Sequence, residues 1–310
     1  MLALYKFVII PTSSLPDLKS ELMTVCRQYS ARGTLLIAEE GINGTLCYPF
    51  SNKISTTTTT LTTTIIDDEL LSFLQNKFDH SLRIRISTAV QPVFSRLKIR
   101  IKSEIQQQSC GPCCPTKQVG EYVNPREWNK LLLDPDTIVI DTRNEYEIDV
   151  GTFKNAINPH TQSFVEFPHW IQKNITPLPV EKKKIAMFCT GGIRCEKATN
   201  ACLQLIPKTK DVSVYHLAGG ILAYLDEFNG KQDESLFTGD CYVFDQRVAV
   251  TYGNKPSMVF REKCHACRHP LSCDDLKRDD YMQGLSCKYC VGQLSEKQQQ
   301  RFTQRQKQME

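Results

Sequence analysis

One cysteine-led, glycine-bearing loop constrains the fold of this chain more than any other segment. Cys189–Arg194 reads Cys-Thr-Gly-Gly-Ile-Arg and lies between an apolar run, Ile185–Phe188, and a helix-like stretch, Glu196–Leu205. Such a strand-to-helix turn is typical of parallel α/β sheets, whose functional sites lie at the carboxyl ends of the strands. Because Gly191 and Gly192 can adopt positive φ, successive backbone N–H groups can converge on one point. The segment therefore predicts an anion-binding nest at a helix N-terminus.

Cys189 is predicted to be a reactive thiolate. A helix N-terminus and a nearby cation such as Arg194 lower a cysteine pKa from about 8.5 to roughly 3.5–7.5, and we expect the sulfur to be both ionised and reachable. The alternative is a buried structural cysteine, although a core cysteine needs neither a Gly-Gly pair nor an arginine in a tight turn. Cys195 has two interpretations, a thiol that resolves an oxidised Cys189 or a half-buried helix residue. The second is favoured.

Composition indicates an ordinary globular protein. The chain has 310 residues, of which 41% are hydrophobic and 23% charged, so two or three domains are expected. A net charge of +4 permits RNA as a partner without requiring it. Met1–Ile10 is interrupted by Lys6, which favours a strand over a signal peptide, and no run reaches the roughly 18 apolar residues of a membrane span. With fourteen cysteines and no secretory signal, we expect a cytoplasmic protein with reduced thiols and no membrane association.

Residues 1–105 predict an α+β domain with a βαββαβ-like order, similar to ferredoxin-like or acylphosphatase-like domains. The expected strands are Leu2–Ile10, Gly33–Ala38, Leu82–Ile86 and Leu97–Ile101, and the expected helices are Leu15–Tyr29 and Asp67–Phe78. Between Arg83 and Lys102 there are six basic residues and no acidic one. Their alternation with apolar residues predicts a basic sheet face, which suits either RNA phosphates or simple solvation.

Residues 106–121 are expected to link this domain to a second one. The linker contains Cys110, Cys113 and Cys114, which are a weak metal-binding signal without a second pair. The run Ser55–Thr64 is nearly all threonine and is expected to be a loop or insert.

Residues 122–232 predict a parallel α/β domain. Asn124 is a reasonable cap for a helix that begins with Pro125. The expected strands are Thr137–Asp141, Lys184–Phe188 and Val212–His216.

Residues 233–310 form a cysteine-rich segment. Its defining residues have the spacing Cys-x2-Cys-x19-Cys-x2-Cys and are Cys264, Cys267, Cys287 and Cys290. Two such turns offer four thiolates to a tetrahedral metal, and a closed site indicates a structural ion, either zinc or a similar soft metal. Reduced thiols or a redox pair are the alternatives. His265, His269 and Cys273 are alternative metal ligands with a less regular spacing. The tail Ser295–Glu310 suits a basic helix or a solvated polar terminus.

The middle region resembles a rhodanese domain. The resemblance rests on Ile140–Glu147, Gly151, Ala156, the Cys189 loop and Leu217–Gly220, with Thr152–Phe153 standing where many rhodaneses have His-Ile. The loop is one residue shorter than the Cys-x5-Arg loop of the phosphatase relatives, and a smaller cradle suits sulfur better than phosphate.

Nearly the whole chain resembles the tRNA uridine hydroxylase family. Four separated motifs carry this resemblance: Ala38–Gly44, Phe94–Lys98, Cys189–Lys197 and Val243–Val250. It implies a tRNA partner and an oxygen-dependent conversion of the wobble uridine, position 34, to 5-hydroxyuridine, with molecular oxygen as co-substrate and Cys189 as the essential cysteine. We identify no glycine-rich dinucleotide fingerprint and no two-histidine-one-carboxylate pattern, so no organic cofactor is indicated, and no protein partner is predicted.

The mechanism implied is addition of the Cys189 thiolate to C6 of a flipped-out uracil, which raises electron density at C5 so that oxygen can react there. Arg194 and the loop amides would hold the thiolate, while Asp141 and Arg143 are expected to lock the neighbouring strand end as an ion pair. The competing function is a rhodanese-type sulfurtransferase that passes sulfur through a Cys189 persulfide. A non-enzymatic RNA-binding protein is disfavoured because the loop retains both Cys189 and Arg194.

Overall fold

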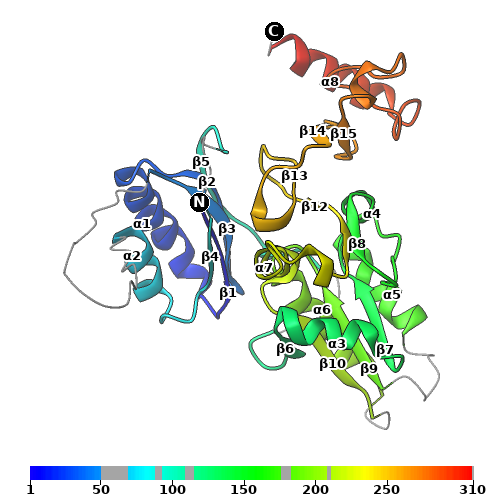
Figure 1. Cartoon of the computed structure of the whole chain (residues 1–310). Helices are drawn as coiled ribbons and strands as arrows, with labels where there is room; N and C mark the ends of the chain where they lie inside the picture. The colour runs from blue at the N-terminus through cyan, green and yellow to red at the C-terminus, as the bar shows by residue number, and fades with distance from the viewer. Residues whose placement is uncertain (50–68, 88–92, 109–114, 176–182, 208–210, 309–310) are drawn as a thin grey trace, which may run out of the picture. The chain divides into compact units, whose positions relative to one another are not determined.

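The computed structural model describes residues 1–49, 69–87, 93–108, 115–175, 183–207 and 211–308 (Figure 1). These residues form two compact units, Met1–Gln107 and Gln108–Glu310. The threonine run Ser55–Thr64 and the linker cysteines Cys110, Cys113 and Cys114 lie outside the described residues.

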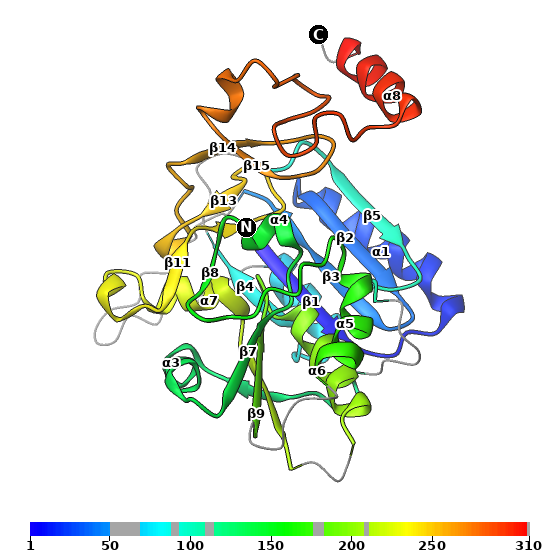
Figure 2. The ribbon, with the colours of Figure 1, turned by 90° about the vertical axis from the view of Figure 1, so that its right-hand side faces the viewer.

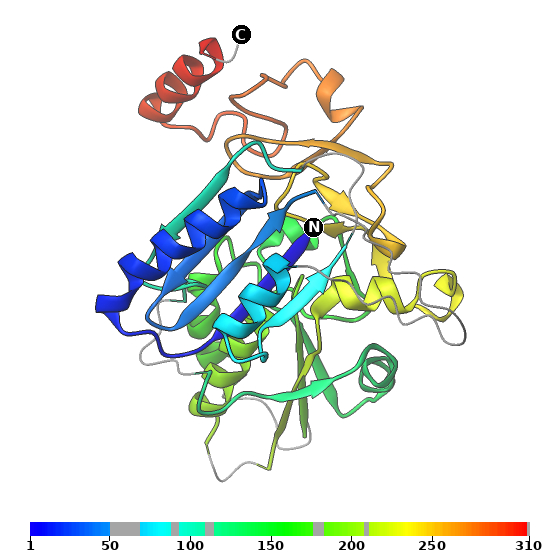
Figure 3. The same cartoon turned by 90° about the vertical axis from the view of Figure 1, so that its left-hand side faces the viewer.

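The first unit is a five-stranded mixed sheet in the order β4-β1-β3-β2-β5. Its strands are β1 Leu2–Phe7, β2 Arg32–Ala38, β3 Gly41–Cys47, β4 Arg83–Ile86 and β5 Leu97–Ile101. Two helices, α1 Leu15–Gln28 and α2 Glu69–Lys77, pack on one face of this sheet (Figure 3). The α+β prediction is confirmed. Strand β3 was not predicted, because its two glycines and an asparagine have low strand propensity; Gly44 is required there, since a Cβ would lie 2.0 Å from the Thr34 carbonyl oxygen.

The predicted basic sheet face is confirmed by the strand register. Ile84 lies opposite Leu4, and Ile99 lies opposite Leu35, and all four pack into the core beneath the helices. Side chains alternate along a strand, so the basic residues between these positions lie on the other face of the sheet. They are Arg83, Arg85, Lys98 and Arg100. Because β4 and β5 are the two edge strands, the charges form two separate rows, one at each edge.

The second unit contains a parallel sheet, as predicted, and its strand order is β6-β10-β9-β7 (Figure 1; β7 and β9 are also labelled in Figure 2). Its strands are β6 Glu121–Val123, β7 Thr137–Asp141, β9 Lys184–Phe188 and β10 Ser213–Leu217. The predicted strands are confirmed to within a residue; β6 was missed because three residues carry little periodicity. The helices are α3 Pro125–Leu133, α4 Glu145–Ile148, α5 Phe167–Asn174, α6 Ile193–Leu205 and α7 Gly220–Glu227.

Two apolar clusters cover the two faces of the parallel sheet. On one face Phe188 packs with Trp128 of α3 and Tyr224 of α7. On the other face Met187 packs with residues of α5 and α6, including Ile171. Asn124 caps α3 as predicted, since its side chain accepts hydrogen bonds from the backbone of residues 126 and 127. The sheet therefore holds the carboxyl end of β9, where the cysteine loop begins, between two packed layers.

Residues 237–308 add three short antiparallel strand pairings and a final helix to the second unit. Strand β11 Phe237–Gly239 pairs with β8 Gly151–Phe153, β12 Cys241–Tyr242 pairs with β13 Ala249–Val250, and β14 Phe260–Lys263 pairs with β15 Pro270–Ser272. The tail is helix α8, Glu296–Lys307. Short 3-10 turns lie at Thr12–Ser14, Phe164–Glu166, Gln232–Glu234, Tyr252–Asn254 and Asp275–Lys277. Within the described residues, no helix has the length and apolar character needed to cross a membrane.

Candidate active site and metal centre

The cysteine loop joins β9 to α6 and forms the predicted nest. Gly192 is the N-cap of α6 with φ of 103°, and its N–H donates to the Cys189 sulfur at 3.1 Å. Gly191 does not take positive φ, which corrects the expectation that both glycines would. Helix α6 begins at Ile193, so the sulfur lies beside the N-terminus of the helix, where the first N–H groups lack the usual partner one turn earlier in the helix.

The electrostatics of the loop favour the ionised sulfur. Burial raises the pKa of the Cys189 thiol, but four stabilising contacts outweigh it and lower the pKa to about 6. They are the hydrogen bond from the Cys195 thiol, the charge of Arg194, and the backbone N–H groups of Cys195 and Gly192. At neutral pH the thiolate therefore predominates, as a nucleophilic cysteine requires.

Cys189 is less exposed than the sequence predicted. Cys189 is 1% exposed, because the N-terminus of α7 covers the loop and the N–H of Ile221 donates to the Cys189 carbonyl at 2.9 Å. The open side of the loop is at Gly191, where an added Cβ would meet no atom within 4 Å. Cys195 is 0% exposed rather than half-buried, since α6 passes through the core. The space beside Gly191 is therefore the open part of an otherwise enclosed loop.

Arg194 is held by a buried carboxylate. Its guanidinium donates to both Glu147 carboxylate oxygens, at 2.6 and 2.7 Å, and to the Thr190 hydroxyl at 3.2 Å. The Arg194 and Glu147 side chains are 7% and 0% exposed. The guanidinium bonds to these partners and not to the sulfur, so it stabilises the thiolate through its charge, as expected of a nearby cation.

Glu147 is the site residue that sequence reasoning did not single out. It lies in α4 and closes a capping box with Asn144, the one local signal that could have indicated a fixed position. Burial opposes ionisation of Glu147, but Arg194 and Arg143 outweigh burial and hold its pKa below the usual value. Glu147 is thus a charged group inside the protein, 42 residues before Cys189 in the sequence.

The predicted ion pair at the end of β7 is confirmed. Arg143 donates to both Asp141 carboxylate oxygens, at 2.9 and 2.6 Å, and both side chains are essentially fully buried. The Thr152 hydroxyl donates to Asp141 at 2.8 Å, which gives a structural role to a position where many rhodaneses have histidine. Arg143 also donates to the Glu147 carbonyl at 3.3 Å, so the two buried ion pairs are linked through one backbone group.

Aromatic rings extend from the loop toward the cysteine-rich segment. The Arg194 guanidinium lies 5.9 Å from the centre of the Phe244 ring, and Phe244 makes an edge contact with Tyr242 at 5.2 Å. Tyr242 in turn contacts Tyr146 of α4 at 5.3 Å. Phe244 is 53% exposed although it is large and apolar. The sequence motif Val243–Val250 therefore lies beside the cysteine loop.

The four predicted cysteine ligands form one cluster. Every pair of sulfur atoms among Cys264, Cys267, Cys287 and Cys290 lies within 4.8 Å. The closest pairs are 3.6 and 3.7 Å apart, near the roughly 3.8 Å edge of a tetrahedron with metal–sulfur bonds of about 2.3 Å. The cluster can hold a metal ion. His265, His269 and Cys273 do not belong to this group, within the part of the chain that the structure describes.

The cysteine cluster is also the core of its segment. The small apolar cluster around it contains Leu271 and three of the four cysteines, so a metal would replace much of the missing hydrophobic packing. His269 connects the segment to α4, because its ring lies 3.4 Å from an Asp149 carboxylate oxygen and 6.0 Å from the Tyr146 ring centre.

Comparison with known proteins assigns the chain to a family. Residues 1–105 match a UPF0176 acylphosphatase-like domain and residues 124–227 match a rhodanese-like domain. A protein of Acaryochloris marina named tRNA uridine(34) hydroxylase is 44% identical, over 99% of this chain and 91% of its own length. The chain belongs to the tRNA uridine(34) hydroxylase family.

Two Prochlorococcus marinus proteins of the same name are 40% and 38% identical, each over 100% of this chain and 94% of its own length. The family resemblance predicted from four sequence motifs is therefore confirmed. The alignment with the Acaryochloris relative also includes the cysteine-rich segment, which lies outside both domain matches. The similarity to the family is therefore not limited to the two matched domains.

Alkylation should report the ionisation of Cys189. With iodoacetamide, the rate of modification at Cys189 should rise through pH of about 6 and then level off, because the reactive form is the thiolate. Cys202 on the same helix is the internal control, since burial raises its pKa to about 12. Peptide mass spectrometry measures both rates. A midpoint near the ordinary pKa of about 8.5 would contradict the electrostatic account.

Glu147→Gln should destabilise the protein strongly. It leaves the buried Arg194 guanidinium without its carboxylate, which typically costs about 3–5 kcal/mol of folding free energy. Glu145→Gln is the control, because the Glu145 pair with His160 lies at the surface and contributes at most about 1 kcal/mol. Urea unfolding followed by circular dichroism measures both. Equal losses in the two variants would show that the buried pair does not hold the loop.

Proposed function

We propose that this protein hydroxylates C5 of uridine 34 in tRNA, with Cys189 as the nucleophile and molecular oxygen as co-substrate. The observation that carries the proposal is a thiol with a pKa of about 6 at the N-terminus of α6, in a chain whose relatives are named for this reaction. A cytoplasmic location is proposed with it.

The chemistry begins with the Cys189 thiolate forming a C–S bond at C6 of uracil, which makes C5 an enolate carbon. C5 then forms a bond to oxygen, and the O–O bond breaks with two electrons and two protons from a thiol reductant, which becomes a disulfide while the second oxygen atom leaves as water. Loss of the C5 proton and cleavage of the C6–S bond release 5-hydroxyuridine and regenerate the thiolate.

The residues around Cys189 have separate tasks in this sequence. Arg194 and the Gly192 N–H stabilise the thiolate before attack and after its release. Cys195 is a positioning residue, whose thiol donates to the sulfur and whose own pKa is raised well above the usual value by burial and by the neighbouring Cys189. Because Cys189 is 1% exposed, only a base withdrawn from its stack can reach it, past Gly191.

Binding of the tRNA phosphates requires positive charge on the protein surface, and the basic sheet face of the first unit supplies it. Its two edge rows contain Arg83 and Arg100, both exposed, and their phosphate contacts would make binding salt-dependent. These rows are proposed as phosphate contacts and not as groups that read the RNA sequence.

Cys189→Ser should abolish 5-hydroxyuridine formation, because a serine hydroxyl is not ionised at neutral pH. The measurement is nucleoside mass spectrometry of tRNA incubated with the protein, oxygen and a thiol reductant. Cys202→Ser, which alters a buried cysteine on the same helix, should keep its activity. If the Cys189→Ser variant still hydroxylates tRNA, Cys189 is not the nucleophile. Transfer of sulfur from thiosulfate to cyanide by the wild type, without any tRNA product, would establish the sulfurtransferase instead.

The metal proposed for the cysteine cluster is zinc in a structural role, since four thiolate ligands leave no open position for a substrate. The purified protein should contain about one zinc ion per chain. Cys287→Ser should lose this ion and loosen the segment, whereas Cys273→Ser should retain it, because Cys273 is exposed and lies outside the cluster. Elemental mass spectrometry measures the content. Equal metal content in the two variants would contradict the assignment.

A further inference from the structure

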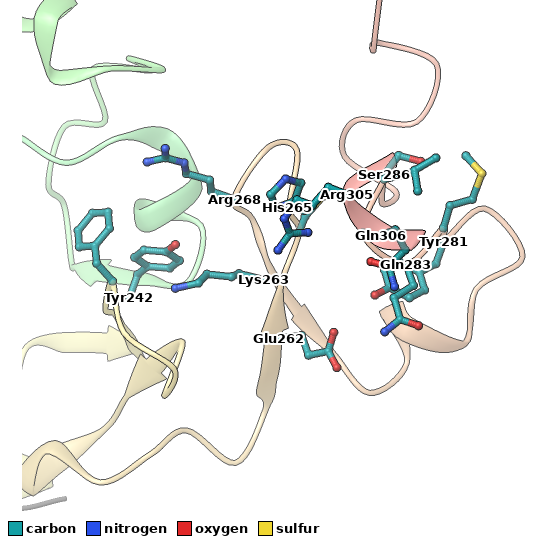
Figure 4. Close-up of a pocket in the computed structure, with 15 residues that line it drawn as sticks. Tyr242, Glu262, Lys263, His265, Arg268, Tyr281, Gln283, Ser286, Arg305 and Gln306 are labelled. Carbon is teal, nitrogen blue, oxygen red and sulfur yellow. The ribbon is translucent and has the colours of Figure 1, made fainter. Parts of the chain in front are cut away.

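The second unit contains a cavity of about 540 Å³ that the proposed reaction does not use (Figure 4). Its wall combines residues from four elements: Tyr242 of β12, Lys263 of β14, Arg268 of the following turn and Arg305 of α8, together with Phe244. The volume is in the range of roughly 300–1,000 Å³ that small-molecule sites occupy. The cavity is therefore large enough for one nucleotide.

The wall of the cavity is positively charged. Three cations, Lys263, Arg268 and Arg305, line it against a single carboxylate, Glu262. Among the described residues neither arginine forms an ion pair, while Lys263 donates to the backbone carbonyl of Asp245 at 3.1 Å. In Figure 4 Lys263 extends from β14 toward Tyr242, and Arg305 lies beside His265. Two guanidinium groups are thus available for an anionic ligand.

The wall of the cavity also presents an aromatic face that continues to the cysteine loop. Phe244 is 53% exposed and contacts Tyr242 inside the wall, while the Arg194 guanidinium lies 5.9 Å from its ring centre. One ring thus borders both the cavity and the residue that stabilises the Cys189 thiolate. Phe244 therefore connects the cavity wall to the arginine of the cysteine loop.

We propose that this cavity binds a nucleotide of the tRNA loop that neighbours the reacting uridine, with its base stacked on Phe244 and its phosphate held by Arg268 and Arg305. The inference rests on the proposed function. Proteins that bind single-stranded RNA combine exposed aromatic rings with cationic side chains in this way. An acidic peptide would account for the cations but not for the exposed ring. Contacts to the neighbouring nucleotide would hold the extruded uridine at Cys189.

The test is binding of an anticodon stem-loop RNA, measured by fluorescence anisotropy at several salt concentrations. Phe244→Leu should weaken binding by about tenfold through lost stacking, and Phe244→Trp should restore it. Arg268→Gln and Arg305→Gln should weaken binding and each reduce the slope of log affinity against log salt by about 0.7. Circular dichroism establishes that each variant is folded.

Matched controls remove one charge outside the cavity. Arg261→Gln on β14 and Lys307→Gln on α8 alter exposed side chains that do not line it, so their affinities should stay within about twofold of wild type. Equal effects in cavity and control variants would overturn the proposal. So would displacement of the RNA by polyglutamate at the same concentration as by unlabelled RNA.

A parallel assay of 5-hydroxyuridine in whole tRNA separates the two proposals. If the wild type hydroxylates and the cavity variants match its kcat/KM, the cavity proposal fails and the proposed function stands. If RNA binding depends on the cavity but the wild type forms no 5-hydroxyuridine, the proposed function fails and the binding site stands.

Discussion

The buried ion pair between Glu147 and Arg194 is the constraint on which the site depends. Two charges removed from water are costly to bury, and good geometry with extra hydrogen bonds must offset that cost. Both conditions are met here, because the contact is bidentate and Thr190 bonds to both partners. The pair ties the first turn of α6 to α4, so the charge of Arg194 stays in place near the sulfur before any substrate arrives.

The sulfur itself shows how a buried group can remain charged. Desolvation alone would protonate Cys189, as burial does for Cys202 and Cys241, whose pKa values rise to about 12. Cys189 differs because a helix N-terminus, a thiol donor and a guanidinium all act on the same atom. The same enclosure that limits access to the thiolate also excludes water from the reaction, so reactivity depends on a substrate that can enter a narrow opening.

Local signals in the sequence predicted much of this structure. The loop after β9, the three longer parallel strands and the cysteine spacing each depend on neighbouring residues, and each was found where expected. Long-range features were not predicted. The partner of Arg194 is far away in sequence, the covering of Cys189 comes from α7, and the cavity assembles residues between 242 and 306. Periodicity and spacing contain no information about which distant segments meet.

The most direct test of the central claim is exchange of the C5 hydrogen of uridine 34 with solvent deuterium, in the absence of oxygen. If the Cys189 thiolate adds reversibly to C6, C5 becomes an enolate carbon that takes up a deuteron, and elimination then returns uridine with one deuterium. Mass spectrometry of nucleosides from substrate tRNA should therefore show deuterated uridine with the wild type and none with Cys189→Ser. Oxygen-dependent hydroxylation by a wild type that catalyses no exchange, or equal exchange by both proteins, would contradict covalent attack by Cys189.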